Sequence, residues 1–154
     1  MLVRTYLALV IGGLAIWVST PAGAQTLAPY EIVGLGIPVP LTDQPGNPAR
    51  GKQVVRDADK ATCLICHSMP IPDEPDQGNI GPSLAGVGSR YTSDELRLRV
   101  VNPKAIYPDT IMPAYYELDG LNRVLEVYRD QPIYTPQQVE DVVSYLASLK
   151  DPRN

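Results

Sequence analysis

The residues best suited to chemistry stand together in one short run, Cys63-Leu64-Ile65-Cys66-His67. This C-x-x-C-H pattern is the attachment signature of a c-type haem. Two thiols three residues apart can each add to a vinyl group of the same porphyrin, and the adjacent imidazole can then bind the iron. The motif predicts one covalently bound haem c, with Cys63 and Cys66 as attachment points and His67 as an axial ligand.

Two other interpretations of the motif find less support in the rest of the chain. The cysteines could form a redox disulfide of the thioredoxin type, but such a site needs a βαβ context, which this proline-rich sequence does not provide. A structural zinc site needs about four ligands. Cys63, Cys66 and His67 are the only cysteines and the only histidine in the sequence, and all lie in one short run.

Because the sequence holds a single histidine, the second axial ligand must be Met, Lys, Tyr, the N-terminal amine, water or nothing. Met69 follows closely after His67, on the same side of the ring, and we interpret it as a loop side chain. Met112 lies far downstream in a loop that Pro108 and Pro113 stiffen. Thioether sulfur is a ligand that suits haem iron. We therefore predict His67 and Met112 as the axial pair.

The second ring nitrogen of a metal-bound imidazole needs a hydrogen-bond partner, which fixes the orientation of the ring. A main-chain carbonyl at Gly81-Pro82 is our candidate, because this loop returns past the motif. A glycine-proline pair can also serve only to turn the chain. The sequence leaves these two interpretations open.

The first 24 residues indicate a cleaved secretory signal peptide. Arg4 forms a short basic region, the run from Tyr6 to Val18 is apolar but short for a membrane span, and residues 22–24 are Ala-Gly-Ala. An uncleaved N-terminal anchor is the alternative. We predict a Sec-type signal over residues 1–24, a periplasmic location and no membrane association of the mature protein.

The charge balance argues against nucleic acid and anionic lipid as partners. The chain has 13 basic and 17 acidic residues, and removal of Arg4 with the signal leaves 12 basic residues, a formal charge of about −5. No cluster of basic residues interrupts this balance. We therefore expect no nucleic-acid binding and no binding to a membrane surface.

Residues 25–47 cannot sustain a helix, because four prolines and three glycines interrupt them. We predict an extended N-terminal strap that lies over the domain, and a flexible leader is the alternative. Five apolar side chains favour the strap: Ile32, Val33, Leu35, Ile37 and Val39.

Three later stretches carry clear helix signals. Asn47-Pro48 starts a helix that should run to about Asp57. Thr92 opens a second helix with a capping box, and this helix should stop before Asn102-Pro103. Thr135 opens the last helix with another capping box. Its apolar stripe consists of Val139, Val142, Val143, Leu146 and Leu149. A weaker helical pattern covers residues 121–128.

These elements predict an all-α domain over residues 48–150, with three to four helices joined by long loops. Loops of this length normally count against a compact fold. A buried macrocycle resolves the conflict, because it supplies the core that the side chains do not. The expected organisation is a signal peptide at 1–24, a strap at 25–47 and a haem-binding domain at 48–150.

Four stretches of the sequence carry a resemblance to a known family. In chain order they are C-L-I-C-H, G-N-I-G-P-S-L-A-G-V-G-S-R-Y, N-P-K-A-I-Y-P-D-T-I-M-P-A-Y-Y and P-Q-Q-V-E-D-V-V-S-Y-L. Together they resemble the SoxX family, the small monohaem cytochrome c subunits of thiosulfate-oxidising SoxAX complexes. The resemblance runs from about Pro48 to Lys150. The first and last stretches are typical of all class I cytochromes c, whereas the middle two are more specific to this family.

The resemblance implies a class I cytochrome c-like fold, with His67 and Met112 as axial ligands and with Gly51 of the first helix meeting Tyr145 of the last. It also implies a periplasmic heterodimer with a SoxA-type cytochrome subunit. Such a complex, an L-cysteine S-thiosulfotransferase, oxidatively couples thiosulfate to a cysteine of the carrier protein SoxYZ and passes the electrons to an acceptor cytochrome.

The cysteine count also indicates which subunit carries out the catalytic chemistry. Haem attachment consumes both thiols, and a methionine in the sixth position leaves no open coordination site. We therefore expect a non-catalytic electron-transfer subunit whose partner makes and breaks the bonds. The alternative is a freestanding soluble c-type cytochrome that shuttles electrons for another periplasmic redox enzyme.

Overall fold

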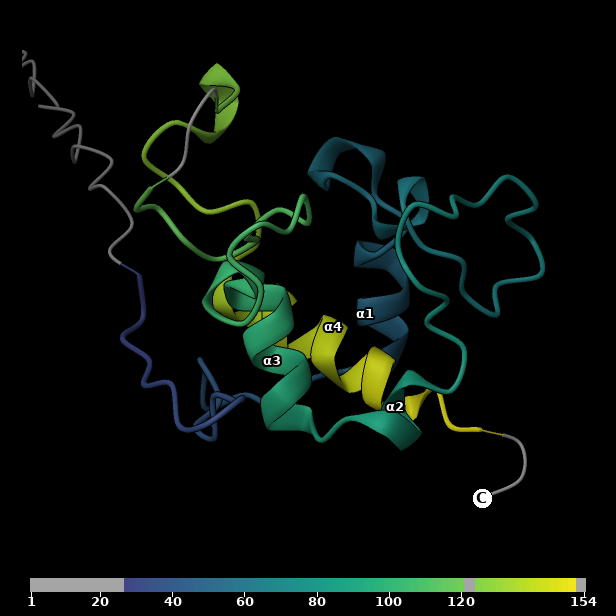
Figure 1. The fold of residues 1–154 in the computed structure, drawn as a ribbon, viewed down its shortest axis with the longest axis horizontal. Coiled ribbons are helices and arrows are strands. Elements are labelled where there is room, and N and C mark those ends of the chain that lie inside the picture. The colour runs from purple at the N-terminus through teal and green to yellow at the C-terminus, as the bar shows by residue number, and fades with distance from the viewer. Residues whose placement is uncertain (1–26, 121–123, 152–154) are drawn as a thin grey trace, which may run out of the picture.

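Helix α4 (Pro136–Ser148) passes through the middle of the structure and contacts each of the other three α-helices (Figure 1). The computed structural model describes residues 27–120 and 124–151, so the predicted signal peptide lies outside the described residues. The other α-helices in these ranges are α1 (Pro48–Val54), α2 (Val87–Arg90) and α3 (Ser93–Val101). Short 3₁₀ turns lie at Ala58–Lys60, Cys63–Ile65, Pro103–Ala105 and Glu126–Tyr128.

The described residues contain helices and loops but no β-strand. Their β-type pairing is a single isolated bridge between Val33 and Gly36. None of the helices in these ranges is long and apolar enough to cross a membrane. The predicted all-α class, with four helices and long loops, is confirmed.

Local sequence signals account for the starts of α3 and α4. The Thr92 side chain accepts a hydrogen bond from the Glu95 amide, and the Glu95 side chain accepts one from the Thr92 amide. Thr135 and Gln138 form the same reciprocal pair at α4, where Pro136 occupies the first turn. Both predicted capping boxes are confirmed, and they satisfy amides that a helix start otherwise leaves unpaired. The apolar stripe of α4 is buried at Val139, Val142, Val143 and Leu146.

Helices α1 and α4 cross with their backbones in contact. A Cβ atom on Gly51 would lie 2.0 Å from the carbonyl oxygen of Asp141 and 2.8 Å from the Cβ of Tyr145. Only glycine fits at this position, and the expected pairing of Gly51 with Tyr145 is confirmed. This crossing fixes the helix that immediately precedes the C-x-x-C-H motif against the last helix.

Helix α1 ends at Val54, earlier than the predicted end near Asp57. The Val55 carbonyl accepts hydrogen bonds from the Thr62 hydroxyl at 2.7 Å and the Cys63 amide at 3.1 Å, instead of continuing a helical ladder. The weak helical prediction for 121–128 falls partly outside the described residues. Its remainder forms only the 3₁₀ turn Glu126–Tyr128.

Residues 27–47 lie over α3 and α4 as an extended strap, as predicted (Figure 1). Ile37 is fully buried, Leu41 is buried, and the Ile37 amide donates to the Asp94 carbonyl at 3.0 Å. The other four apolar residues that favoured a strap are exposed: Ile32, Val33, Leu35 and Val39. Hydrogen bonds and the burial of other apolar strap residues, including Leu27, Leu41 and Tyr30, therefore hold the strap together.

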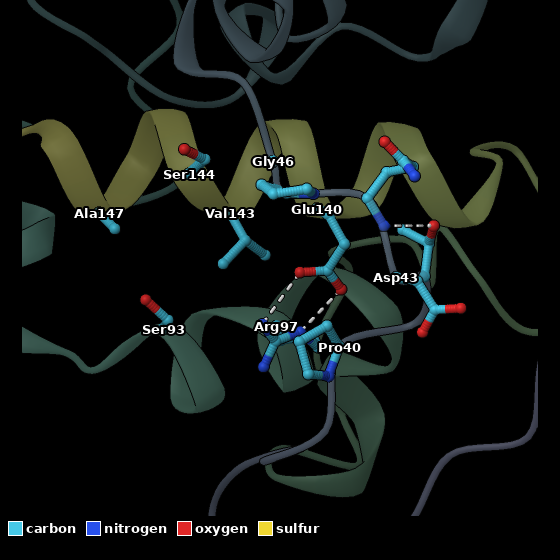
Figure 2. Close-up of a pocket in the computed structure, with 12 residues that line it drawn as sticks. Pro40, Asp43, Gly46, Ser93, Arg97, Glu140, Val143, Ser144 and Ala147 are labelled. Atoms are coloured by element: carbon cyan, nitrogen blue, oxygen red, sulfur yellow. Dashed lines mark hydrogen bonds and ion pairs between the residues drawn. The ribbon is translucent and has the colours of Figure 1, made fainter.

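A buried ion pair fixes the centre of the strap. The Arg97 guanidinium of α3 donates two hydrogen bonds to the Glu140 carboxylate of α4, at 2.8 and 2.9 Å, and Figure 2 shows them facing each other beside Pro40. Arg97 also donates to the Ile37 carbonyl at 2.6 Å, while Glu140 accepts from the Leu41 amide at 3.0 Å. Each buried charge thus has both an opposite charge and a main-chain partner.

The next residue on α4, Asp141, fixes the end of the strap. Its carboxylate accepts the Asn47 amide at 2.7 Å and two Arg50 hydrogen bonds at 2.7 and 2.8 Å. Burial tends to raise the pKa of Asp141, but the hydrogen bonds from Arg50, Asn47 and Gln137 outweigh it and hold the pKa below its usual value. Two consecutive carboxylates of one helix therefore bind the strap at two points.

Candidate functional site

A cavity of about 670 Å³ lies between the C-x-x-C-H turn, helices α3 and α4, and the loop at 103–113. All four residues predicted to hold a cofactor line it: Cys63, Cys66, His67 and Met112. The volume is within the usual range for a site that encloses an organic ligand. Most of the remaining lining is apolar, including Leu96 and Val100 of α3 and Val142 and Leu146 of α4.

The two thiols are positioned by the 3₁₀ turn Cys63–Ile65. The Thr62 hydroxyl accepts the Leu64 amide at 3.2 Å, and the Cys63 carbonyl accepts the amides of Cys66 at 3.2 Å and His67 at 2.9 Å. This tight turn brings the two cysteines and the histidine to one side of the cavity. Both thiols are free and half-buried, and burial raises the pKa of Cys63.

His67 is oriented by the loop that follows it. Its Nδ1 lies 2.7 Å from the carbonyl oxygen of Pro82, which is the partner predicted from the Gly81-Pro82 pair. Because a carbonyl oxygen only accepts, Nδ1 carries the proton and Nε2 is the nitrogen left with a lone pair. A Cβ atom on Gly81 would lie 2.3 Å from Cε1 of the ring, so glycine is required there.

The loop that carries Met112 is braced by hydrogen bonds of its own. The Met112 amide donates to the Thr110 hydroxyl at 3.2 Å, and Lys104 donates to the Thr110 carbonyl at 2.9 Å. Met112 is half-buried and lines the cavity, whereas Met69 is buried elsewhere in the core. The interpretation of Met69 as a loop side chain outside the site is therefore confirmed.

Two stacked tyrosines line the cavity beside Cys63, and the sequence analysis missed them. The ring centroids of Tyr115 and Tyr134 lie 4.5 Å apart, and the Tyr134 hydroxyl is 3.9 Å from the Cys63 sulfur. The Tyr115 hydroxyl donates to the Ala61 carbonyl at 3.0 Å. Burial is the main cause that raises the pKa of both hydroxyls, so they stay protonated. The absence of Phe from the sequence was the available signal, because tyrosines had to supply the aromatic lining.

Two arginines are the other missed residues. Among the described residues that line the cavity, Arg90 and Arg99 are the only ones with a full charge, and no carboxylate joins them. Arg99 lies over the ring of Tyr91 at 3.9 Å, and Arg90 donates to the carbonyls of Ser83 and Ala85 at 2.9 and 2.7 Å. An acidic chain therefore presents two positive charges to this cavity.

A second cavity, of about 410 Å³, lies between strap residues 40–46 and helices α3 and α4 (Figure 2). None of the predicted site residues lines it, and its charged pair, Arg97 and Glu140, is mutually satisfied. The described residues also contain no group of three or more His, Cys, Asp or Glu side chains that could hold a metal ion directly. The larger cavity is therefore the candidate site. Its two thiols, imidazole and thioether fit a macrocycle that already contains its metal ion.

Comparison with known proteins agrees with this geometry. Residues 48–150 match the family described as cytochrome c. A chain in the "Crystal structure of SoxXA from P. pantotrophus" is 35% identical with a TM-score of 0.73, and the match covers 79% of this chain and 95% of that chain. No curated protein matches this chain.

Proposed function

The chain belongs to the cytochrome c family, and on that premise we propose that it is the electron-transfer haem subunit of a periplasmic sulfur-oxidising complex. Membership of the family implies an electron-transfer role and covalently bound haem c. The resemblance to SoxX and the cytochrome c-like fold are confirmed by the match to the SoxXA structure. The observation that carries the proposal is that two thiols, one imidazole and one thioether line a single cavity.

The four predicted residues fit the haem in complementary ways. Cys63 and Cys66 would form the two thioether bonds, since they are the two thiols of the chain and share one turn. His67 would bind the iron through Nε2, because the Pro82 carbonyl holds the proton on Nδ1. Met112, which lines the same cavity, would supply the sixth ligand.

The two arginines would take the negatively charged end of the cofactor. A haem carries two propionates, and Arg90 and Arg99 are the charged groups available to them in the described lining. Contact with the Tyr91 ring restrains Arg99, and two main-chain carbonyls restrain Arg90. These restraints would help to set the rotation of the haem in its plane.

With two protein ligands to the iron and no free thiol, the chain is suited to electron transfer and not to bond chemistry. The bound haem supplies a reversible one-electron carrier. Thioether formation would use both thiols and Met112 would be the second axial ligand, so the chain would keep no free thiol and no open iron position for sulfur chemistry. Buried apolar residues such as Leu96, Val142 and Leu146 exclude water from the cavity. The chain therefore stores and passes electrons while its partner does the bond chemistry.

We place that chemistry on a SoxA-type cytochrome subunit bound as a heterodimer. The complex would oxidatively couple thiosulfate to a cysteine of the carrier protein SoxYZ and release two electrons to an acceptor cytochrome. The support is that the matched structure is that of SoxXA. The proposed periplasmic location rests on the predicted signal peptide at residues 1–24.

Native purification tests this proposal against the freestanding shuttle. We expect the chain to copurify with a second haem protein, visible as two haem-stained bands under denaturing conditions. The purified complex should oxidise thiosulfate only when the carrier protein and an electron acceptor are both present. A haem-containing monomer that copurifies with no second haem protein would instead support the shuttle. A colourless protein would contradict both.

A further inference from the structure

The N-terminal end of the strap is bound to the segment that follows Met112. The Ala28 amide donates to the Tyr116 hydroxyl at 2.7 Å, and the Tyr30 hydroxyl donates to Oε2 of Glu117 at 2.8 Å. These pairs are 88 and 87 residues apart in the sequence. They are therefore tertiary contacts between the strap and the ligand loop, distinct from the Arg97–Glu140 contacts at the centre of the strap.

Residues 114–117 connect this attachment to the haem cavity. Ala114, Tyr115 and Tyr116 are buried, and the amides of Tyr115 and Tyr116 donate to the last carbonyls of α3, at 3.1 and 3.3 Å. The Tyr115 side chain lines the cavity, as Met112 does. Movement of Met112 away from the cavity would therefore pull on a segment whose far end the strap holds.

Several hydrogen bonds at the end of this segment converge on the carboxylate of Glu117. Besides Tyr30, its carboxylate accepts hydrogen bonds from the Asn102 side chain at 3.3 Å and from the amides of Leu118 and Asp119 at 2.8 and 3.3 Å. Partial burial opposes the charge, yet these donors lower the pKa of Glu117. Loss of the Tyr30 hydroxyl would leave the carboxylate satisfied and would remove only the bond that belongs to the strap.

We propose that the strap is a latch on the sixth-ligand loop, and that it slows the release of Met112 from the iron through Tyr30 and Ala28. Tyr30 is a positioning residue, because it acts on Met112 through Glu117 and residues 114–116. The inference rests on the Met112 ligation in the proposed function. Its readout is the rate at which an external ligand replaces Met112.

The test compares Tyr30→Phe with the unmodified haem-loaded protein, with imidazole as the external ligand for the ferric form. Imidazole binds only after Met112 leaves, so its binding rate reports opening of the loop. We expect Tyr30→Phe to bind imidazole roughly three- to tenfold faster, since it loses one hydrogen bond to a charged group. The spectrum without imidazole should remain that of the unmodified protein. Tyr128→Phe is the matched control, because its hydroxyl donates to the Asp59 carbonyl and not to Glu117 or another residue of the segment 112–117.

A second variant and a second measurement keep the test independent of one substitution. Tyr116→Phe removes the acceptor of the Ala28 amide and should also accelerate imidazole binding. Hydrogen exchange at the Tyr115 and Tyr116 amides should be faster in Tyr30→Phe than in Tyr128→Phe. Equal imidazole rates in all forms, or equal acceleration in Tyr128→Phe, would overturn the latch. If Met112→Ala leaves the spectrum unchanged, the proposed ligation itself fails, so the two failures are distinguishable.

Discussion

The imidazole of His67 rests directly on the backbone of Gly81, where a Cβ atom would lie 2.3 Å from Cε1 of the ring. The same loop fixes Nδ1 of His67 through the Pro82 carbonyl. One loop therefore sets both the position and the tautomer of the proposed proximal ligand.

Gly81→Ala should displace the imidazole and change the haem environment. Overpacking costs about 1–3 kcal/mol in the free energy of unfolding, and here the displaced group is the proposed axial ligand. We expect a shifted reduction potential and an altered visible spectrum. Gly51→Ala is the matched control: its Cβ would meet Asp141 at 2.0 Å, so it should destabilise the fold and leave the potential of the folded protein unchanged. Equal shifts in potential would contradict a specific role of Gly81.

Met112→Ala should remove the sixth ligand. Thioether ligation favours the reduced iron, so we expect the reduction potential to fall by roughly 100–300 mV, with a changed visible spectrum. Met69→Ala is the control, since Met69 is buried outside the cavity. That variant should lose about 2–5 kcal/mol of stability and keep the spectrum. An unchanged potential in Met112→Ala would show that Met112 is not the ligand.

Arg99→Gln should make the oxidised haem easier to form. Removal of a positive charge near the cofactor stabilises the more positive ferric state, and about 59 mV corresponds to 1.4 kcal/mol for one electron. We expect the reduction potential to fall by roughly 20–60 mV at low salt. Arg129→Gln, which removes a cation from an exposed pair with Glu126, should leave the potential unchanged. Equal potentials in the two variants would contradict the placement of a propionate near Arg99.

Glu140→Gln should be strongly destabilising. It leaves the buried Arg97 guanidinium without its opposite charge, which costs about 3–5 kcal/mol in the free energy of unfolding. Glu126→Gln breaks the exposed pair with Arg129 and should cost at most about 0.5 kcal/mol. Denaturant unfolding of the two variants measures the difference. A small effect in Glu140→Gln would mean that the buried ion pair does not fix the strap.

Tyr30 should make the stability of the fold sensitive to alkaline pH. Burial, followed by the hydrogen bond to Glu117, raises the pKa of Tyr30 from 10.0 to about 12. Because the pKa is higher in the folded protein, the stabilisation is fully present below about pH 10 and is lost as the pH rises through about 12. The free energy of unfolding should therefore fall more steeply over this window in the unmodified protein than in Tyr30→Phe. Parallel curves would contradict this linkage.

The features that the sequence predicts well are those encoded within a few residues. The Thr92 and Thr135 capping boxes involve neighbours three residues apart, and the C-x-x-C-H run places its own three functional groups on one turn. In both cases local chemistry leaves few alternatives. The partner of His67 was only a candidate, because the sequence did not separate a hydrogen-bonding role of the Gly81-Pro82 pair from a simple turn.

Contacts that depend on the path of the chain were not predictable in the same way. Arg97 and Glu140 are 43 residues apart, and nothing in either helix indicates that they meet. Tyr134 lies beside Cys63 only because the loop before α4 returns to the cavity. The strap was expected to pack through five apolar side chains, but four of the five are exposed, and Leu27, Tyr30 and Leu41 pack against the core instead.

The attachment of the strap to Glu140 and Asp141 also constrains the order of events during synthesis and folding. Leu41 and Asn47 are synthesised early, but their partners on α4 lie 99 and 94 residues later. The strap can contact α3 earlier through Asp94 and Arg97, but its contacts with α4 cannot form until α4 has been made. Until then the turn with Cys63 and Cys66 lacks the wall that α4 provides. If haem is attached to this turn as proposed, its attachment does not depend on the strap contacts of α4, and the last helix decides when those contacts can form.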